Sequence, residues 1–386
     1  MAAACIHLAF LQPYVVLAPG ERTNVFSGLV CLAALAVVVV CRKPGALKLW
    51  APAVIISLAL AALGGLSAAF SLTPWPSFLR VTVLLASGLG GFWCARLVLD
   101  SPGSQARFLW LCLGLLTAMV VLALAGHRVG GVNKIEYFLN SASHPLTNTI
   151  MLLSFAPLAL LDRQSRSLKA YGAALLILGY AALCLSERVS VVFIPVGVAL
   201  AAGLAGALRL RHLALMLLGL LLVAGYFSSQ ILWFKLSKQY PDYRLESYPF
   251  SWFIATEHPW WGIGLRAPRD KFLPAYQVKY PYTDKERFAT MLKDIVSSDN
   301  ILLTFLAGLG FPFTIIYIGA VLALLAHLAR LAYRPPPGAV LPPLVLLLPL
   351  VMAMVQYQLF DGLLFPQNCW FFHVLLGLIP TGERQA

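Results

Sequence analysis

Residues that could do chemistry gather between positions 186 and 300, in three short polar groups beside apolar segments. The first is Ser186-Glu187-Arg188, which joins two apolar segments with almost no loop between them. The second begins at Tyr243-Arg244 and ends with the turn from His258 to Gly264. The third is Ser297-Ser298-Asp299-Asn300, directly before another apolar segment. Ionisable side chains are costly beside apolar segments, so these groups are the first candidates for a site.

Arg188 is a candidate for binding phosphate. A guanidinium group can donate two parallel hydrogen bonds to a phosphate, and it remains charged at any relevant pH. The same position also suits an arginine that only extends its charged end from a helix to the membrane surface. The residue types leave both interpretations open, with Glu187 as its candidate structural partner.

The second group combines a short helix with a tight turn. Arg244 opens an amphipathic segment that we expect to be helical over residues 245–257, because His258-Pro259 ends it. Gly262 and Gly264 then allow the backbone to approach either a ligand or another helix closely. A purely structural turn explains this pattern as well as a binding site does.

Asp299, in the third group, is the candidate for acid–base chemistry. Its carboxylate could remove a proton from a substrate hydroxyl, or it could pair with one of the arginines. The alternative is that the polar residues only cap a short helix, which we expect to start at Ser297 or Ser298 and to run through residues 299–307.

The composition places these groups in a membrane protein. Of 386 residues, 60% are hydrophobic and 11% are charged, the net charge is +13, and the mean hydropathy is +0.82. A soluble domain is roughly a quarter charged, so this chain cannot cover a water-facing surface. The composition excludes a soluble enzyme, a secreted disulfide scaffold and a disordered protein. It predicts an all-α fold, a polytopic transmembrane helical bundle.

Apolar segments recur along the chain and predict about twelve membrane spans, each needing roughly 20 residues. We expect them at residues 5–19, 25–41, 50–70, 78–99, 107–126, 146–161, 168–185, 189–207, 211–227, 309–331, 340–360 and 368–380. Spans 1–9 then occupy residues 1–227, a large loop occupies 228–308, and spans 10–12 occupy 309–386. A structureless connection of that length is uncommon, so we expect short helices in the loop.

The basic residues orient this bundle. Thirteen Lys and Arg residues follow even-numbered spans or lie in the C-terminal tail, against five in the short connections after odd-numbered spans. By the positive-inside rule, both termini then face the cytoplasm. The loop at 228–308 faces outward, since long loops translocate regardless of their charge.

The sequence predicts neither a metal nor a cofactor. It contains no HExxH motif, no paired Cys/His spacing, no carboxylate cluster and no GxxxxGK[ST] loop. No basic patch accompanies a motif that reads nucleic acid, so no nucleic-acid partner is expected. The energy for any reaction must then come from a gradient or from an activated substrate.

Taken in order, the three groups resemble the O-antigen ligase/polymerase superfamily of membrane glycan transferases. The resembling features are Ser186 with Arg188 between two spans, Arg244 at the head of a loop helix, the HP-x-x-G-x-G turn from His258 to Gly264, and Asp299-Asn300 with Leu303 through Gly310. A further similarity is His144-Pro145-Leu146-Thr147-Asn148 at the start of a span, whereas the first 125 residues are similar only in hydropathy.

The resemblance implies a transferase that moves an oligosaccharide or polysaccharide from undecaprenyl diphosphate onto an acceptor sugar. The acceptor is lipid A–core in the ligases and the next repeat unit in the polymerases, and the reaction takes place at the periplasmic face of a bacterial inner membrane, among membrane lipids. The resemblance also implies that Arg188 and Arg244 hold the donor diphosphate. The other residues expected to contact substrate are His258, Asn300, Tyr243, Trp252 and His144.

The chain departs from the superfamily at the expected catalytic base. The ligases carry a His directly before the Asn, whereas this chain has Asp299 there. Either Asp299 replaces that His, or His258 or His144 supplies the imidazole, or the chain acts on a different acceptor.

Two other classes of function remain open from the residues alone. A transporter or flippase for a lipid-linked glycan would show charges within its spans and paired halves, and both are nearly absent here. A non-catalytic scaffold for glycan assembly would explain the missing His.

Overall fold

The structure is a computed structural model that describes most of the chain. The described residues are 1–10, 15–18, 21–23, 25–41, 51–130, 143–163, 165–186, 190–206, 244–280, 298–335, 341–358 and 361–380. Two of the expected site residues, Arg188 and Tyr243, lie outside them, as does the span expected at 211–227.

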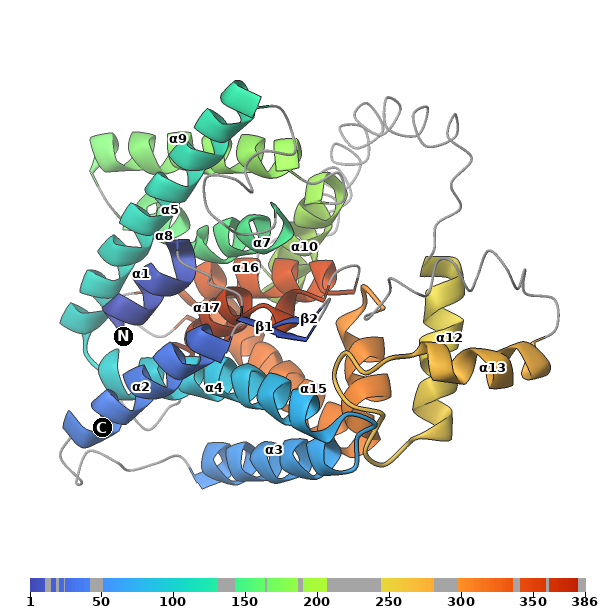
Figure 1. The fold of residues 1–386 in the computed structure, drawn as a ribbon. Coiled ribbons are helices and arrows are strands. Elements are labelled where there is room, and N and C mark those ends of the chain that lie inside the picture. The colour runs from blue at the N-terminus through green and yellow to red at the C-terminus, as the bar shows by residue number, and fades with distance from the viewer. Residues whose placement is uncertain are drawn as a thin grey trace.

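Helices dominate the described residues, which confirms the expected all-α class (Figure 1). They are α1 (Ala2–Phe10), α2 (Val25–Cys41), α3 (Ala51–Ala69), α4 (Pro74–Val98), α5 (Pro102–Gly130), α7 (Ser143–Leu153), α8 (Phe155–Arg163), α9 (Arg166–Ser186), α10 (Ser190–Leu204), α12 (Arg244–Glu257), α13 (Leu273–Lys279), α15 (Ile301–Tyr333), α16 (Pro343–Gln356) and α17 (Pro366–Gly377), with the 3-10 helices η2 (Asp270–Phe272) and η3 (Gly362–Leu364). The exception to the helical pattern is a small antiparallel hairpin of β1 (Val15–Ala18) and β2 (Glu21–Thr23).

Among the residues that the structure describes, four helices are long and apolar enough to cross a membrane. They are α3, α4, α15 and residues 102–125 of α5. Three shorter apolar helical segments cover Val25–Cys41, Asn148–Asp162 and Pro343–Gln356. These helices fit a multi-pass membrane protein, while the number of twelve spans stays a prediction.

The first expected span is not a single helix. Where residues 5–19 were expected to form one span, α1 ends at Phe10 and Val15–Ala18 is a strand. Pro13 lies between the two elements, and proline cannot donate the backbone hydrogen bond that would continue a helix. The nine residues of α1 measure about 13 Å along the axis, which is too short for a hydrocarbon core about 30 Å thick.

The span expected at 146–161 is also divided. α7 ends at Leu153, Ser154 forms a turn, and α8 restarts at Phe155. Pro157 lies in the first turn of α8, where its missing N–H cannot bond back to Leu153. The interruption therefore follows from the proline, which the sequence pattern alone placed inside one span.

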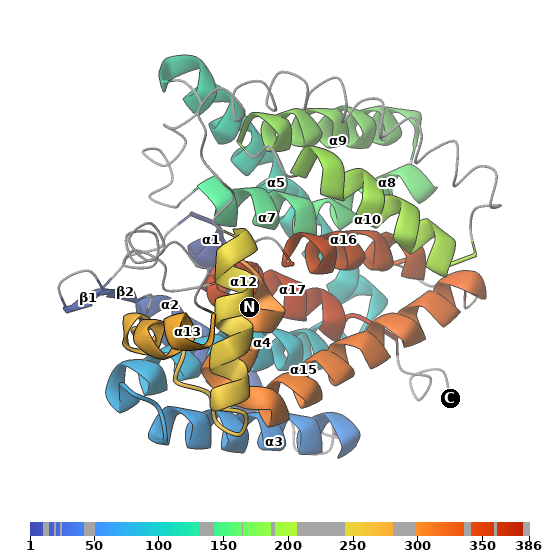
Figure 2. The same ribbon diagram turned by 90° about the vertical axis from the view of Figure 1, so that its right-hand side faces the viewer.

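Helices α4 and α17 pack along each other at the centre of the bundle. On α4, a Cβ added to Gly91 would lie 2.7 Å from the carbonyl oxygen of Trp370, so these two helices approach closely. Helices α2 and α3 pack on α4, while α15 packs on α3 and α16. Helices α5, α7, α8 and α9 form a second group, which joins the centre through contacts of α7 with α16 and α17 (Figures 1 and 2).

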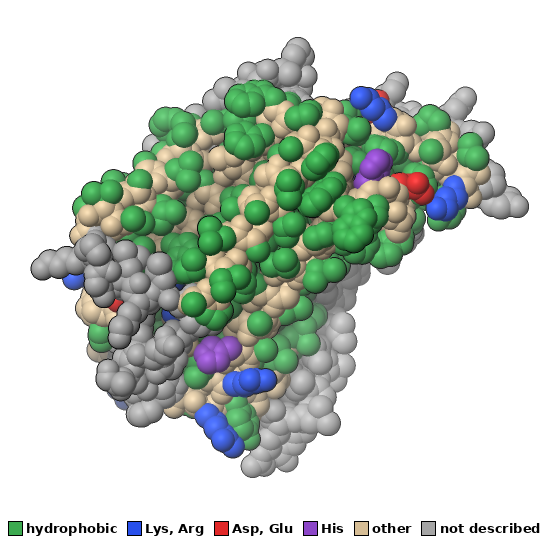
Figure 3. All heavy atoms as spheres, turned by 90° about the horizontal axis from the view of Figure 1, so that it is seen from below, with side chains coloured by type: hydrophobic (Ala, Val, Ile, Leu, Met, Phe, Trp, Pro, Cys, Tyr) green, Lys and Arg blue, Asp and Glu red, His purple; other side chains and the backbone are tan. Residues whose placement is uncertain are grey.

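The face of the molecule on the side of α3 is covered with hydrophobic side chains. Figure 3 shows this face from below, with most Lys, Arg, Asp and Glu side chains at its margins. On α3, Ile55 and Leu58 are exposed, and on α15 so are Ile315 and Leu322. Exposed aliphatic side chains on two apolar helices of membrane-spanning length are typical of a surface that faces lipid.

Helix α15 consists of two helical segments that meet at a kink. It extends from Ile301 to Tyr333, but its φ and ψ are not helical at Gly310, so the expected short helix at 299–307 and the expected span at 309–331 correspond to the two helical segments on either side of this kink. Its N-cap is Asn300, whose side chain accepts a hydrogen bond from the N–H of Leu303, so the expectation of a cap at Ser297 or Ser298 is wrong. Asn and Ser are about equally good N-cap residues, so residue type alone did not distinguish positions 297, 298 and 300.

The helix bends at Gly310, which has φ 81° and ψ 171°. The turn from His258 to Gly264 packs against this bend through backbone hydrogen bonds. Ile263 and Gly264 donate to the carbonyls of residues 307 and 308, and Phe311 donates to the carbonyl of Pro259. A Cβ on Gly262 would lie 2.5 Å from the carbonyl carbon of Gly308. The glycines of the turn therefore allow close approach to a helix. The sequence had left open whether they approach a ligand or a helix.

The two ends of the bundle differ. We call the end that carries α12, α13 and the start of α15 the loop end; it lies at the right of Figure 1. The helix expected at 245–257 is confirmed as α12, and it packs on α15 and α13 around a small core of its own. The opposite, far end carries the last turns of α15 with Arg330 and Arg334, and there His327 Nε2 lies 2.9 Å from the carbonyl oxygen of Pro380.

Replacing Gly310 by alanine should destabilise the loop end. An alanine there would be held at a backbone conformation that is nearly restricted to glycine, and its Cβ would overlap the carbonyl of Trp260. We expect a cost of about 1–3 kcal/mol, seen as a lower Tm of the purified protein in detergent. The matched control is Gly319→Ala on the same helix, where an added Cβ meets no atom within 4 Å. Equal Tm values for the two variants would contradict this role of the bend.

Candidate active site

A buried polar network links four segments at the loop end. Arg269 Nη1 donates hydrogen bonds to Ser251 Oγ of α12 at 2.8 Å and to Ser298 Oγ at 3.1 Å. Thr304 Oγ1 of α15 accepts from the backbone N–H of Ser298 and donates to Asp361 Oδ2 at 3.0 Å. A chain of hydroxyl groups thus connects a buried arginine to a buried aspartate from the segment after α16.

The two charges of this network are almost completely removed from solvent. Arg269 is 5% exposed and Asp361 is 3% exposed. Burial lowers the pKa of Arg269 to about 10, and the nearby Asp361 carboxylate acts against this shift by favouring the charged guanidinium. The guanidinium therefore stays charged at neutral pH, and the two buried charges stabilise each other.

The start of α15 is also tied to the end of α16. Asn300 Nδ2 donates to the carbonyl of Gln358 at 3.0 Å, while its Oδ1 caps α15. The N–H of Ile301 donates to the carbonyl of Tyr357 at 2.9 Å. Both the nitrogen and the oxygen of the Asn300 amide therefore make hydrogen bonds where the start of α15 meets the end of α16.

Asp299 lies between the buried network and this joint. It has φ 50°, a left-handed conformation that Asp and Asn adopt more readily than most residues. It is half-buried, and Tyr248 Oη of α12 lies 3.5 Å from its backbone carbonyl oxygen and 3.1 Å from that of Gln358. Neighbours on both sides therefore fix the backbone of the expected base.

Arg244 begins the helix whose Tyr248 reaches residue 299. It is the first residue of the helix, one turn before Tyr248, and its side chain is outside the part of the structure that is described. One helical turn advances about 5.4 Å, so the backbone of Arg244 lies near the Tyr248 contact with residue 299.

Helix α10, which begins two residues after Arg188, starts at the loop end. Its Gly197 packs on α16, where an added Cβ would lie 2.7 Å from Met352 Cα. Its last turn contacts the far end of α15, because Gly206 lies against Tyr333. α10 and α15 therefore run in the same direction, and Ser190 lies about 10 Å beyond Gly197 toward the loop end.

The structure separates His258 from Asp299. His258 follows the last turn of α12, ten residues or about 15 Å along the axis from Tyr248. Its ring packs edge-on against Phe272, with the ring centres 5.2 Å apart. His144 is near the start of α7, and its side chain is not described. That helix reaches α17 at the Thr149–Asn368 hydrogen bond of 2.9 Å.

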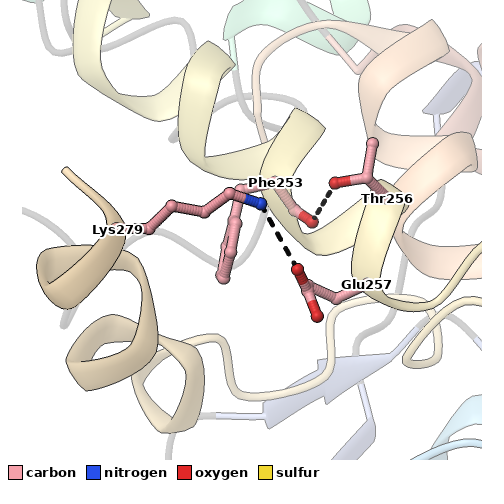
Figure 4. A network of polar contacts seen from close by, with 4 residues as sticks. All are labelled: Phe253, Thr256, Glu257 and Lys279. Carbon is pink, nitrogen blue, oxygen red and sulfur yellow. Dashed lines mark hydrogen bonds and ion pairs between the residues drawn. The ribbon is translucent and has the colours of Figure 1, made fainter.

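Trp252 lies on the outer side of α12. It is 48% exposed, and its ring contacts Phe311 edge-on at 5.9 Å. Nearby, α13 is held on α12 by an ion pair of 3.5 Å between Lys279 and Glu257, with Lys279 Nζ 5.2 Å from the centre of the Phe253 ring (Figure 4). Both charged groups are about half exposed, so this pair positions α13 but contributes little stability.

Sequence reasoning missed Arg269 and Asp361. Asp361 offered one signal, since it is an isolated carboxylate directly after an apolar segment. Arg269 is one of many basic residues in the loop, and no local motif pairs it with a residue beyond α16. Within the described residues, no group of three or more His, Cys, Asp and Glu side chains could hold a metal ion.

Removing one charge of the network should destabilise the protein strongly. Arg269→Ala would remove a buried cation that interacts favourably with Asp361 and would leave Ser251 and Ser298 without their donor, at an expected cost of about 3–5 kcal/mol. We expect a lower Tm, and a smaller loss for the double variant Arg269→Met/Asp361→Leu than for the two single changes added together. Lys271→Ala, at an exposed position two residues away, is the control that should leave Tm unchanged. If Arg269→Ala had the same Tm as the wild type, the network would not contribute to the stability of the protein.

Comparison with known protein families gives a match that includes most of these segments. Residues 173–318 match the family described as O-antigen ligase. The matched range contains Arg188, Arg244, Asp299 and Asn300, and it excludes His144 and Asp361. No curated protein matches the chain. The family match confirms the resemblance that the sequence motifs indicated, and it assigns residues 173–318 to the O-antigen ligase superfamily.

Proposed function

We propose that this protein is a membrane glycan transferase that moves a polyprenyl-diphosphate-linked glycan onto an acceptor sugar at the loop end of the bundle. One observation carries the proposal. The O-antigen ligase match covers the segments that begin α10, α12 and α15, and these three helix starts lie at the same end. Under the expected topology, that end faces the periplasm.

Arg188 and Arg244 are the proposed ligands of the donor diphosphate. Arg188 precedes the start of α10, and Arg244 begins α12 near the Tyr248 contact. Two arginines can hold the diphosphate bidentately and stabilise the negative charge that grows on it as the glycosyl–oxygen bond breaks. Because the leaving group is already a diphosphate, the reaction needs no ATP.

Asp299 is the proposed general base, in place of the family's His. Its carboxylate would accept the proton of the acceptor hydroxyl while that oxygen forms a bond to the anomeric carbon. The electron pair of the broken bond would leave with polyprenyl diphosphate. Its backbone is fixed beside Tyr248 and Asn300, whereas His258 lies at the other end of α12. This separation favours Asp299 over His258 as the base.

A polyprenyl chain also needs an apolar place within the bilayer. An apolar cavity of about 300 Å³ lies between α2, α3 and α4, and its lining extends along α4 from Gly90 to Phe78. Phe78 is two residues from Arg80, whose Nη1 bonds the carbonyl of Leu265 in the loop at 2.9 Å. The cavity therefore extends toward the loop end, and we propose that it takes part of the donor's hydrocarbon chain.

Removing either arginine should abolish transfer without preventing insertion. Arg188→Ala and Arg244→Ala should each reduce product formation by about 100-fold or more, because charge stabilisation of this kind is worth about 3–4 kcal/mol. The assay would follow a labelled polyprenyl-diphosphate glycan and its acceptor with the purified protein in vesicles. Arg166→Ala, at an exposed position at the start of α9, is the control. Normal transfer by both loop-end variants would overturn the site, and movement of the donor across the bilayer without a covalent product would favour a flippase.

The identity of the base can be tested separately. Asp299→Asn keeps a residue type that tolerates the left-handed backbone, and we expect it to lose about 100-fold to 10,000-fold in rate as general-base catalysis is removed. His258→Ala and His144→Ala should keep most of the activity. Only variants whose Tm equals that of the wild type are compared. A normal rate for Asp299→Asn together with an inactive histidine variant would assign the base to that histidine.

A further inference from the structure

A second cavity lies toward the far end of the bundle, away from the proposed site. Its volume is about 510 Å³, within the range of small-molecule sites, and its lining comes from α3, α4, α15 and α17. Small residues leave the space open: Ala53 and Ser57 on α3 face Ala320 and Ala323 on α15. Both of these helices have membrane-spanning length and expose aliphatic side chains. A molecule that enters from this side comes from the bilayer.

The polar groups of this cavity are largely bonded within the protein. Tyr317 Oη lies 3.1 Å from His373 Nε2, and His373 Nδ1 lies 2.7 Å from the carbonyl oxygen of Cys369, to which it donates. Ser57 Oγ accepts from Trp93 Nε1 at 3.1 Å and donates to the carbonyl of residue 53 at 2.7 Å. Few donors or acceptors are left for a polar ligand, so the cavity suits a hydrocarbon chain.

The end of the cavity nearest the far end is cationic. His327 belongs to the lining, and Arg330 and Arg334 follow it at intervals of three and seven residues, which places all three on neighbouring faces of α15. Both arginines are exposed, and neither has an ion-pair partner among the described residues. Arginines beside an apolar cavity between membrane helices are suited to the phosphate of an anionic lipid.

We propose that this cavity binds one acyl chain of an anionic glycerophospholipid from the leaflet at the far end. The lipid phosphate lies at Arg330 and Arg334, next to His327, and the chain fills the space between α3 and α15. α3 is mostly exposed at the edge of the bundle, and the lipid fixes it to α15. This binding site is separate from the proposed transferase site and does not depend on that function.

Photolabelling can test the proposal. The purified full-length protein is placed in phosphatidylcholine vesicles that contain a trace of phosphatidylglycerol with a photoreactive acyl chain, and labelled peptides are identified by mass spectrometry. We expect labels on the facing sides of α3 and α15. Ala320→Trp and Ala53→Trp fill the cavity from opposite walls and should reduce this labelling about tenfold, which corresponds to about 1.4 kcal/mol. Leu322→Trp, on the exposed side of α15, is the control that should label as the wild type does.

The headgroup preference is tested by competition. Unlabelled phosphatidylglycerol should displace the probe better than phosphatidylcholine does, and the double variant Arg330→Gln/Arg334→Gln should lose this difference. Both arginines are exposed, so this variant does not disturb packing. Ala320→Trp or Ala53→Trp counts in the test only if the purified variant elutes as a single species in size-exclusion chromatography. One such variant is enough for the test. The proposal would be overturned if a filled-cavity variant were labelled as strongly as the wild type. It would also be overturned if the two lipids competed equally, or if a polyprenyl phosphate competed more strongly than phosphatidylglycerol.

Discussion

The backbone contact between the 258–264 turn and the bend of α15 determines how the loop end is built. A regular helix has no free N–H or C=O groups along its middle, so a loop cannot hydrogen-bond to it there. At Gly310 the helix bends, and its carbonyls at residues 307 and 308 accept bonds from Ile263 and Gly264. This contact fixes α12 against the start of α15, and the placement of Tyr248 beside Asp299 follows from it.

The buried charges of the loop end depend on that arrangement. Arg269 and Asp361 belong to different segments, and only the packing of α12 on α15 brings Ser251, Ser298 and Thr304 between them. In a site of low dielectric, such a network is stabilising when complete and costly when one member is removed. It includes Ser298 and Thr304 on either side of Asp299 in the chain, so it can hold the half-buried Asp299 at a fixed position.

The two ends of the bundle use polar residues in different ways. At the loop end, polar side chains are buried, hydrogen-bonded to one another and close to the segments matched to O-antigen ligase. At the far end, arginines are exposed beside an apolar cavity whose own polar groups are mostly bonded. The first arrangement suits chemistry on a charged lipid-linked donor, and the second suits lipid binding, since an exposed cation near the bilayer surface attracts phosphate.

The sequence by itself indicated the helical membrane class, the resemblance of residues 173–318 to O-antigen ligases and the helix over 245–257, because composition, proline positions and motif order are local properties. It placed the N-cap of α15 at Ser297 or Ser298 and joined residues 5–19 into one span, since hydropathy does not register a cap or a proline break. Only the tertiary structure decided that Gly262 approaches a helix, that His258 is remote from Asp299, and that Arg269 is paired through hydroxyls with Asp361. These contacts join residues far apart in the chain, and no local pattern encodes such distances.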